Sequence, residues 1–327
     1  MSLRYYLQWG KGLNKVAYYA LCGLNYAAPK SLYRGTANRY LESLTDDELT
    51  RATERADYYN RMPVCRPGAD WKSIADFKYP RGEKHHHSTY FFELYRWLKY
   101  FDPADRMAYL FGDITEEPQQ PTFVKSRPIT SGPTNSVIMK LDRIRHFQFV
   151  NDRTPWRDKK DMIVSRNVVW WPKRQRLLDR WFGHPMCNLG QVNTNLNHNH
   201  PEWIQPFMSI EQQLGYKFIA CIEGNDVATN LKWVMGSNSI AVTPRPEYET
   251  WYMEGALKPD YHYIEVRPDF ADLIDKLTYY VNHPDEAEQI IANAHAWVDS
   301  FMSARIEKAA SLLVVKKYME RSGQNPN

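Results

Sequence analysis

The residues best suited to chemistry follow a short apolar run near the middle of the chain. Residues 217–222 form this run, and Gly224, Asn225 and Asp226 come directly after it. Asn225 and Asp226 can cap a helix, because apolar residues recur at helical spacing beyond them, at Val227, Leu231, Val234 and Met235. Residues 239–243 then predict the next buried strand. Ligands bind at the carboxyl ends of parallel strands, so we expect the turn from Gly224 to Thr229 to face a bound molecule.

A second candidate is Asp113, which lies just beyond a predicted strand at 107–111. A carboxylate at a strand end can be exposed at the mouth of a cleft, where it could accept a proton from a hydroxyl group. An Asp after a Gly is also a common turn residue. Glu116 and Glu117, in the same predicted loop, are rivals for the role of base, although two carboxylates in a loop are usually only solvated.

Basic residues gather in the middle of the chain. Residues 122–180 hold 14 Lys and Arg but only 5 Asp, whereas the whole chain has a net charge of +4. This excess indicates an anionic ligand, either a nucleotide diphosphate, a phosphorylated glycolipid or a nucleic acid, or else a solvated basic face. Arg166 ends a predicted strand, and Arg174 and Arg176 open a predicted helix, where guanidinium groups and helix N–H groups favour phosphate.

Length and composition indicate a globular protein with two domains. The chain has 327 residues, of which 43% are hydrophobic and 24% charged. The sequence has no apolar stretch long enough to span a membrane and no signal-peptide pattern, so we expect a cytoplasmic protein. The four cysteines are dispersed, which argues against a zinc site or a disulfide framework.

Strands alternate with helices along the chain, which predicts an α/β fold. The strands expected are those named above and one at 161–165. The helices expected are at residues 45–62, with Thr45 as the cap, and at 88–101, 173–182, 269–281, 284–298 and 300–321. Residues 191–206, rich in Asn and His, predict a polar loop.

Several motifs together resemble one family of enzymes. The motifs are IEGND, NLKWVM, SNS before a strand, and WYMEGALKPDYHYIEV, preceded by YRWLKYF, FGDITEEPQQPTFVKSRPI and NSVIMKLDRIRHF in the same order. This set resembles glycosyltransferase family 90, and in particular its bacterial lipopolysaccharide core branch. The similar stretches run from about residue 90 to about residue 297.

The resemblance implies the GT-B architecture, in which two Rossmann-like domains face each other across a cleft. We expect an N-terminal acceptor-side domain at 1–155 and a nucleotide-sugar-binding domain at 156–298. The last helix, at 299–327, would pack back on the first domain.

The resemblance also implies an inverting transfer of a glucose, galactose or xylose type of sugar from a UDP-sugar to a hydroxyl of a lipopolysaccharide or other glycan. Asp113 would be the catalytic base. Arg166, Arg174 and Arg176 would bind the diphosphate, and Lys125, Ser126 and Arg127 would line the cleft. The sequence has no Asp-x-Asp motif, so no metal and no other cofactor is expected, with Arg residues and helix dipoles stabilising the leaving group.

The remaining donor-site candidates surround the polar turn. Glu223 and Asp226 place negative charge where a diphosphate would otherwise bind, so they suit sugar or ribose hydroxyls. Asn225, Thr229 and the backbone of Gly224 could meet the phosphates. Family members of the eukaryotic branch typically carry an Arg where this chain has Asn230. Lys232 is a further donor-binding candidate, although it could simply face solvent. Glu254 is a candidate sugar contact, although a Glu in a helix is usually on the surface.

The first 35 residues contain five Lys and Arg, many aromatic residues and no acid. Such a segment could lie on an anionic membrane surface or pack as an N-terminal helix. We expect no nucleic-acid partner. The alternative to an enzyme is a non-catalytic glycan-binding or membrane-surface protein that retains the fold.

Overall fold

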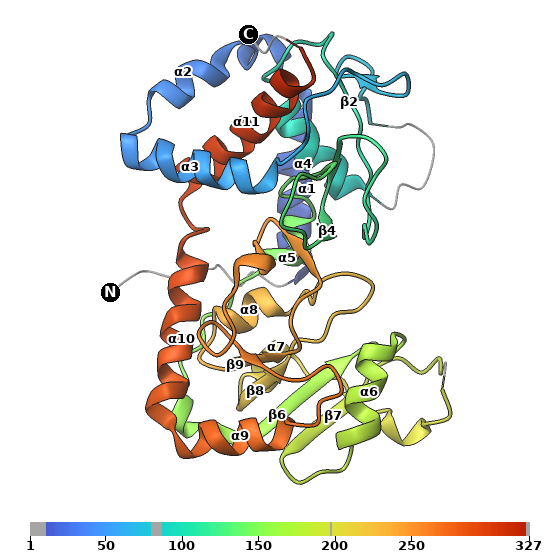
Figure 1. The fold of residues 1–327 in the computed structure, drawn as a ribbon, viewed down its shortest axis with the longest axis vertical. Coiled ribbons are helices and arrows are strands. Elements are labelled where there is room, and N and C mark those ends of the chain that lie inside the picture. The colour runs from blue at the N-terminus through green and yellow to red at the C-terminus, as the bar shows by residue number, and fades with distance from the viewer. Residues whose placement is uncertain (1–10, 80–86, 197, 325–327) are drawn as a thin grey trace. The chain divides into compact units, whose positions relative to one another are not determined.

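The computed structural model describes residues 11–79, 87–196 and 198–324. These residues divide into two compact units. Unit 1 contains residues 146–247 and 253–300, and unit 2 contains residues 11–145, 248–252 and the chain from 301 onward. Figure 1 labels the helices and strands of both.

Unit 1 is built around a five-stranded parallel sheet. Its order is β11 (Ile264–Glu265), β9 (Ile240–Thr243), β8 (Tyr216–Ala220), β6 (Lys160–Asn167) and β7 (Cys187–Gln191). The strands predicted at 161–165, 217–222 and 239–243 are therefore confirmed. The chain extends the sheet from β6 to β7 on one side and then from β8 to β11 on the other. The strand order thus reverses between β6 and β8, which is the place where sheets of this kind bind ligands.

The longer helices of the unit cover the sheet because each presents an apolar stripe to the core. The helices of unit 1 are α6 (Pro172–Trp181), α7 (Ile210–Gln213), α8 (Leu231–Met235), α9 (Leu273–Asn282) and α10 (Pro284–Asp299). Leu177 of α6, Leu277 of α9 and Ile290 of α10 share one core with Phe218 and Val242 of the strands. Three of the predicted helices, at 173–182, 269–281 and 284–298, are thus confirmed to within four residues.

The expected start of the helix after β8 is wrong. Asn225 and Asp226 do not cap it, because α8 begins at Leu231 and Asn230 is its N-cap. The Asn230 side chain instead donates a hydrogen bond from Nδ2 to the carbonyl of Ala220, at 2.9 Å. This bond returns the chain to the end of β8, so residues 221–230 form a long turn whose apolar side chains, such as Val227, are buried.

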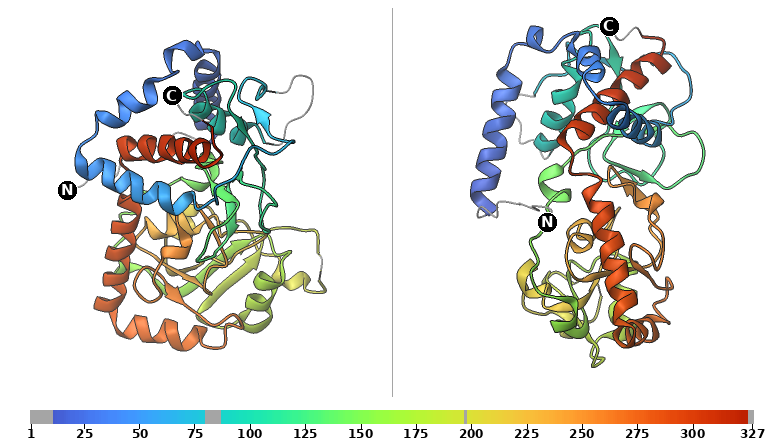
Figure 2. Two further views of the ribbon diagram at one scale, coloured as in Figure 1. Left: turned by 45° about the horizontal axis from the view of Figure 1, so that its top comes forward. Right: turned by 90° about the vertical axis from the view of Figure 1, so that its left-hand side faces the viewer.

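Unit 2 is largely helical. Its helices are α1 (Lys11–Ala27), α2 (Thr36–Glu42), α3 (Asp46–Tyr59), α4 (Ser88–Leu98) and α11 (Ala304–Arg321), and the short α5 (Arg143–His146) ends where unit 1 begins. Thr45 caps α3 as predicted, and it forms a capping box with Glu48. The last helix, α11, packs beside α3 within this unit, as both views of Figure 2 show.

The strands of unit 2 are short and form pairs. β1 (Lys72–Ser73) pairs with β2 (Arg106–Met107), β3 (Thr122–Val124) with β5 (Ser136–Ile138), and β4 (Ser126–Pro128) with β10 (Tyr248–Thr250). Of the strand expected at 107–111, Met107 belongs to β2, and the rest forms only a single β-bridge, from Tyr109 to Phe123. The described part of unit 2 therefore lacks the broad parallel sheet of unit 1, and the α/β character of the chain rests mainly on unit 1.

The structure also bears on cysteine chemistry and membrane insertion. All four cysteines are free thiols. None of the helices in the described ranges is both long and apolar enough to cross a bilayer.

Candidate active site

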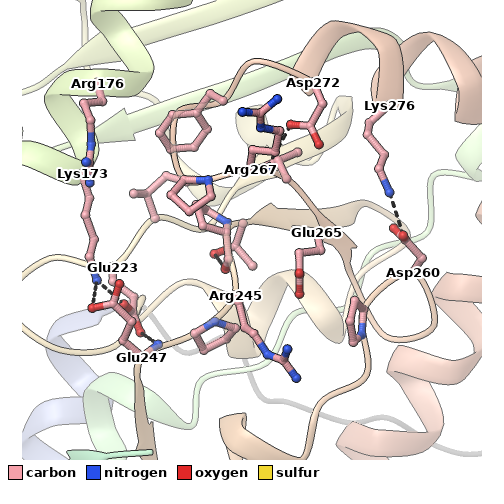
Figure 3. A pocket seen from close by; sticks show the side chains of 18 residues that line it. Lys173, Arg176, Glu223, Arg245, Glu247, Asp260, Glu265, Arg267, Asp272 and Lys276 are labelled. Atoms are coloured by element: carbon pink, nitrogen blue, oxygen red, sulfur yellow. Dashed lines mark hydrogen bonds and ion pairs between the residues drawn. The ribbon is translucent and has the colours of Figure 1, made fainter.

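A pocket of about 690 Å³ opens at the carboxyl ends of β8, β9 and β11, entirely within unit 1 (Figure 3). Residues just beyond each strand line it, including Glu223 after β8, Arg245 after β9 and Arg267 after β11. Lys173 and Arg176 of α6 form one side, and Lys276 of α9 forms another. The pocket therefore lies where the strand ends of a parallel sheet are expected to hold a ligand.

The pocket is lined by charges of both signs. Five of its residues are cationic and five are carboxylates, which are Lys173, Arg176, Arg245, Arg267 and Lys276 together with Glu223, Glu247, Asp260, Glu265 and Asp272. On one side Lys173 contacts Glu223 and Glu247, and on another Lys276 lies 2.6 Å from Asp260. Arg176 and Arg245 are exposed and make no ion pair with any described residue. Both therefore have guanidinium donors available for an anionic ligand.

Glu223 is a fixed part of the wall. The Lys173 ammonium donates to its Oε2 at 2.7 Å, and the Glu247 amide donates to its Oε1 at 3.0 Å. Burial lowers the pKa of Lys173, but the hydrogen bonds to Glu223 and Glu247 outweigh burial and leave that pKa above its usual value. A carboxylate oxygen has further lone pairs, so Glu223 can still accept a hydrogen bond from a ligand hydroxyl.

Arg174 joins the two loops that meet where the strand order reverses. Its Nε donates to the carbonyl of Ile222 at 3.1 Å, and its Nη1 donates to the carbonyl of Val168 at 2.9 Å. A Cβ added to Gly224 would lie 3.0 Å from Arg174 Nη2, so the glycine lets this side chain approach the backbone closely. Arg174 and Gly224 thus lie together at the predicted place, with Arg174 bridging the loops after β6 and β8.

Arg166 does not lie in the pocket. Its guanidinium donates to the carbonyls of Ser165, Asn188 and Pro206 and to the Asn188 side chain, at 2.7 to 3.0 Å. Burial lowers the pKa of this guanidinium. These bonds connect β6 to β7 and to the loop that contains Pro206. The Arg166 guanidinium therefore already has hydrogen-bond partners in the protein, and its role in phosphate binding stays a prediction.

The other residues of the predicted turn differ in accessibility. Asn225 is exposed, Thr229 is half-buried and Asp226 is buried. None of the three lines the pocket, nor does Gly224, although Glu223 beside them does. The structure therefore brings only part of the predicted donor site, Glu223, Arg176 and the neighbouring Arg174, to one place.

Lys232 and Glu254 form a sealed ion pair. Their Nζ and Oε1 atoms are 2.5 Å apart, and the side chains are 0% and 1% exposed. Neither side chain is exposed to a ligand, so we correct the expectations that Lys232 binds the donor or faces solvent and that Glu254 contacts a sugar or lies on the surface. Met253 adopts a left-handed backbone conformation, with φ 58°, immediately before Glu254. The chain therefore turns just before the buried Glu254. The ion pair with Lys232 attaches this turn to α8.

In unit 2, Asp113 contacts Lys125. The ammonium lies 2.5 Å from Asp113 Oδ1, and it is buried while the Asp113 side chain is 28% exposed. Asp142 lies close enough to interact with both charges, and sequence reasoning missed it. Burial raises the pKa of Asp142, and Asp113 adds to this rise, whereas Arg145 and Lys125 oppose it. A carboxylate that contacts an ammonium and stays partly exposed is a group that can accept a proton from a hydroxyl.

Ser126 and Arg127 are buried rather than exposed. Arg127 donates to the carbonyls of Tyr58, Tyr59 and Ser136 and to Glu249 Oε1, and its side chain is 0% exposed. Arg127 therefore anchors β10 against β4, and we correct the expectation that it lines a cleft. Ser126 Oγ accepts a hydrogen bond from the amide of Ile114, next to Asp113.

Glu116 and Glu117 are both exposed. Glu117 accepts a hydrogen bond from the backbone of Asn135, at 2.7 Å. The structure gives neither of them a buried cation of the kind that Asp113 has, so Asp113 remains the stronger candidate for a base.

A groove of about 450 Å³ lies in unit 2, beside the strand segment that leads to Asp113. Tyr109, Leu110 and Met107 give it an apolar floor, and polar side chains surround them, namely Asp70, Lys72, Gln119, Gln120 and Thr122. Gln120 is held by a hydrogen bond from Trp71 Nε1 to its Oε1, at 2.7 Å. A Cβ on Gly68 would lie only 2.3 Å from that Oε1, so the glycine leaves room for the amide.

Sequence reasoning missed the cations of the pocket beyond α6. Arg245 lies two residues after β9, and Arg267 lies two residues after β11. The signal was available, because the carboxyl ends of every strand in a parallel sheet meet at one edge.

The described residues contain no group of three or more His, Cys, Asp and Glu side chains that could hold a metal ion. The pocket instead offers guanidinium and ammonium groups. Metal-independent chemistry therefore stays a prediction, based on the donor groups that are present.

A parallel α/β sheet with a charged pocket at its strand ends is typical of enzymes that bind phosphorylated ligands. Sequence comparison defines the class: the chain belongs to glycosyl transferase family 90, whose model matches residues 139–321. The protein is thus a glycosyltransferase.

Three relatives illustrate how the similarity is distributed. The O-glucosyltransferase LpsA of Dichelobacter nodosus is 43% identical over 274 residues, which cover 83% of this chain and 84% of that protein. Protein O-glucosyltransferase 3 of Homo sapiens is 25% identical over 112 residues, which cover 34% and 22% of the two chains. An uncharacterized protein, 027R of Frog virus 3, is 28% identical over 164 residues, which cover 44% and 16%.

Proposed function

We propose that the protein transfers a sugar, glucose, galactose or xylose in type, from a UDP-sugar to a hydroxyl of a lipopolysaccharide or another glycan, with inversion at the anomeric carbon. The observation that carries the proposal is the pocket at the ends of β8, β9 and β11 in a chain of this family. Glucose is favoured by the name of the O-glucosyltransferase LpsA, and lipopolysaccharide by the resemblance of the motifs to the core branch.

The pocket has the chemistry for a sugar nucleotide. Arg176 and Arg245 are accessible cations that suit a diphosphate, and guanidinium groups can bind phosphate oxygens in pairs. Glu223 and Glu265 are carboxylates at the strand ends that suit hydroxyls of a ribose or of the transferred sugar. Arg174 would keep the loops on either side in place, while Gly224, Asn225 and Thr229 remain candidate phosphate contacts.

Asp113 is the proposed base. Its carboxylate takes the proton of the acceptor hydroxyl, whose oxygen attacks the anomeric carbon. The bond from that carbon to the diphosphate breaks, and the electron pair leaves with UDP. Cations of the pocket stabilise the charge that develops on the departing diphosphate, which lowers the barrier without a metal ion.

We propose that the two units are the two lobes of a GT-B enzyme, with the donor in unit 1 and the acceptor in unit 2. The groove beside Tyr109 has the chemistry of a glycan subsite, because an aromatic ring and fixed amides can recognise a sugar. Thr122 in the groove and Lys125 beside Asp113 are three residues apart, which is at most about 10 Å along the chain. The groove would therefore hold a sugar of the acceptor next to the one that reacts.

The donor assignment is tested by thermal shift of the purified protein with UDP, UDP-glucose, UDP-galactose, UDP-xylose and, as a control, ADP-glucose. A ligand that binds only the folded state raises the melting temperature, so we expect a rise with UDP compounds alone. Equal shifts with ADP-glucose, or no shift with any nucleotide, would contradict the proposal. Incubation of the best donor with rough-type lipopolysaccharide then measures transfer, and binding without transfer would indicate the non-catalytic alternative.

The groove is tested with Gln120→Ala and, as a control, with Gln148→Ala, which changes an exposed glutamine of unit 1 that does not line the groove. We expect the first to raise KM for a core oligosaccharide about fivefold, with unchanged donor KM, because one or two hydrogen bonds are lost. The second should leave both constants unchanged. An equal acceptor KM in all three proteins would exclude the groove as a subsite.

A further inference from the structure

The solvent-facing side of α1 is almost entirely apolar. Val16, Leu21 and Leu24 are 69%, 66% and 70% exposed. They lie on one continuous face, because exposed residues recur three or four positions apart at Val16, Ala17, Ala20, Leu21, Leu24 and Ala27. Leu32, just beyond the helix, is 67% exposed as well. An exposed apolar patch of this kind marks a surface that binds something.

The opposite side of α1 is firmly attached to unit 2. Tyr18 donates a hydrogen bond to Glu93 of α4 at 2.7 Å, and the ring of Tyr26 packs against Phe91 and Tyr95. Lys99 donates to the carbonyl of Asn25 at 3.1 Å. In the right-hand view of Figure 2, α1 runs along one side of the unit. The helix is therefore held in place by one flank while its apolar flank faces outward.

The charges around α1 identify the kind of partner. The first 35 residues carry five Lys and Arg and no acid. Lys15 is exposed near the start of the helix, whereas the Lys30 ammonium beyond its end lies over the ring of Tyr95, on the attached side. An apolar stripe with basic residues and no acids is the pattern of a helix that lies in the surface of an anionic bilayer.

A second copy of the chain fits this surface less well. Two such segments would bring like charges together, which opposes association. A helix of 17 residues is about 25 Å long, so its outer face of about 10 Å width offers only about 250 Å². A stable protein interface buries about 800 Å² on each partner.

We propose that α1 docks this protein on an anionic lipid bilayer, with Val16, Leu21 and Leu24 inserted among the lipids and the basic N-terminal segment close to the bilayer surface. The proposed docking does not depend on the glycosyl-transfer activity. It would, however, bring the enzyme to a surface where lipid-linked acceptors are found.

Vesicle co-sedimentation tests the proposal, with neither donor nor acceptor present, so its result is independent of the proposed activity. The vesicles contain phosphatidylethanolamine and phosphatidylglycerol at three to one, or phosphatidylcholine alone. We expect binding to the first kind only, reduced by 0.5 M salt, and at least tenfold weaker for the double variant Leu21→Glu/Leu24→Glu.

Two matched controls carry an exposed apolar residue elsewhere. Val64 and Phe207 are 77% and 69% exposed, so Val64→Glu and Phe207→Glu should bind vesicles within twofold of the parent. All variants should keep the parent melting temperature, because the changed side chains are exposed. Unchanged vesicle binding by the double variant, or equal binding to phosphatidylcholine, would overturn the proposal. A dimer of the parent protein that the double variant abolishes, without vesicle binding, would also overturn it and assign the face to a second copy.

Discussion

Two lysine–carboxylate pairs, one in each unit, have almost the same geometry and opposite accessibility. Lys125 and Asp113 in unit 2 are 2.5 Å apart, and so are Lys232 and Glu254 in unit 1. The ammonium is buried in both. The carboxylate is 28% exposed in Asp113 but only 1% exposed in Glu254. The difference lies in whether a ligand can reach the carboxylate.

This difference separates an ion pair that could take part in catalysis from one that can only stabilise the fold. A buried ion pair is costly to form, and removing one partner leaves an uncompensated charge. Glu254 is out of reach of any substrate, so its pair can act only on the fold. Asp113 keeps an open side, and a substrate hydroxyl could approach it there. Accessibility, rather than residue type or spacing, therefore decides which pair is a candidate for catalysis.

The strongest test of the comparison is Asp113→Asn. We expect kcat to fall about a thousandfold, equivalent to about 4 kcal/mol, because the variant cannot take the proton of the acceptor. Donor affinity, measured by calorimetry with the UDP-sugar, should change less than twofold. Glu117→Gln is the matched control, since it removes an exposed carboxylate from the same loop and should keep near-parent activity. Full activity of Asp113→Asn would remove Asp113 from the mechanism.

The sealed pair gives the next largest effect. Glu254→Gln should lower the free energy of unfolding by about 3 kcal/mol, because Lys232 remains buried without its counter-charge. Replacing both residues, Lys232→Met with Glu254→Met, should recover most of the loss, because no isolated charge is left. Denaturant unfolding followed by circular dichroism measures all three proteins. A single variant as stable as the parent would show that the pair is not what holds this segment.

The comparison also shows how far sequence reasoning reaches. Most of the strands and the longer helices of unit 1 were predictable, because β6, β8 and α6 have clear hydrophobic periods and end at polar residues, but β7 and β11 were not predicted. The turn after β8 was not, because Asn225 and Asp226 look like caps, whereas the burial of Val227 and the bond from Asn230 to Ala220 outweigh local preference. Local patterns do not show which long-range contact will dominate.

The candidate site was predictable only in part. Arg176 and Glu223 were found, because they lie beside the β6–α6 and β8 turns. Arg127 was expected in the cleft, and Lys232 at the donor or in solvent. Both are buried, against Glu249 and Glu254, which lie more than a hundred and about twenty residues away. A charged side chain in a sequence does not reveal whether it will meet its counter-charge in the core or remain available to a ligand.

The comparison predicts that an accessible charge without an ion-pair partner in the protein is available to a ligand. Arg245 in the pocket of unit 1 tests this for a cation. Arg245→Ala should weaken UDP-sugar binding about tenfold, because one charge-assisted contact to the diphosphate is lost. Arg180→Ala is the control: Arg180 is an exposed Arg of α6 that does not line the pocket, and its loss should leave the affinity unchanged. Isothermal titration with UDP measures both. Equal affinities would place the diphosphate elsewhere, with Arg166 as the next residue to replace.

Asp105 extends the comparison to a buried carboxyl that makes no ion pair with a described residue. Burial raises its pKa to about 6, and Asp102 adds to the rise. In the unfolded chain the pKa is about 3.9, so between these values the folded state holds a proton that the unfolded state has lost. Stability therefore falls as pH rises from about 4 to about 6, and the full cost remains at pH 7.

Asp105→Asn removes that cost. We expect the variant to be about 1 kcal/mol more stable at pH 7, a rise in melting temperature of about 2–4 °C, and to show no gain at pH 4. Asp70→Asn, at an exposed carboxylate of the same unit, should show no gain at either pH. Thermal unfolding at several pH values measures both variants. A gain that persists at pH 4 would mean that the amide acts through packing or hydrogen bonding. In that case the unpaired charge of Asp105 would not be the cause of the lower stability at pH 7. Asp105 could then no longer be compared with the paired Glu254 as a buried carboxylate without a counter-charge.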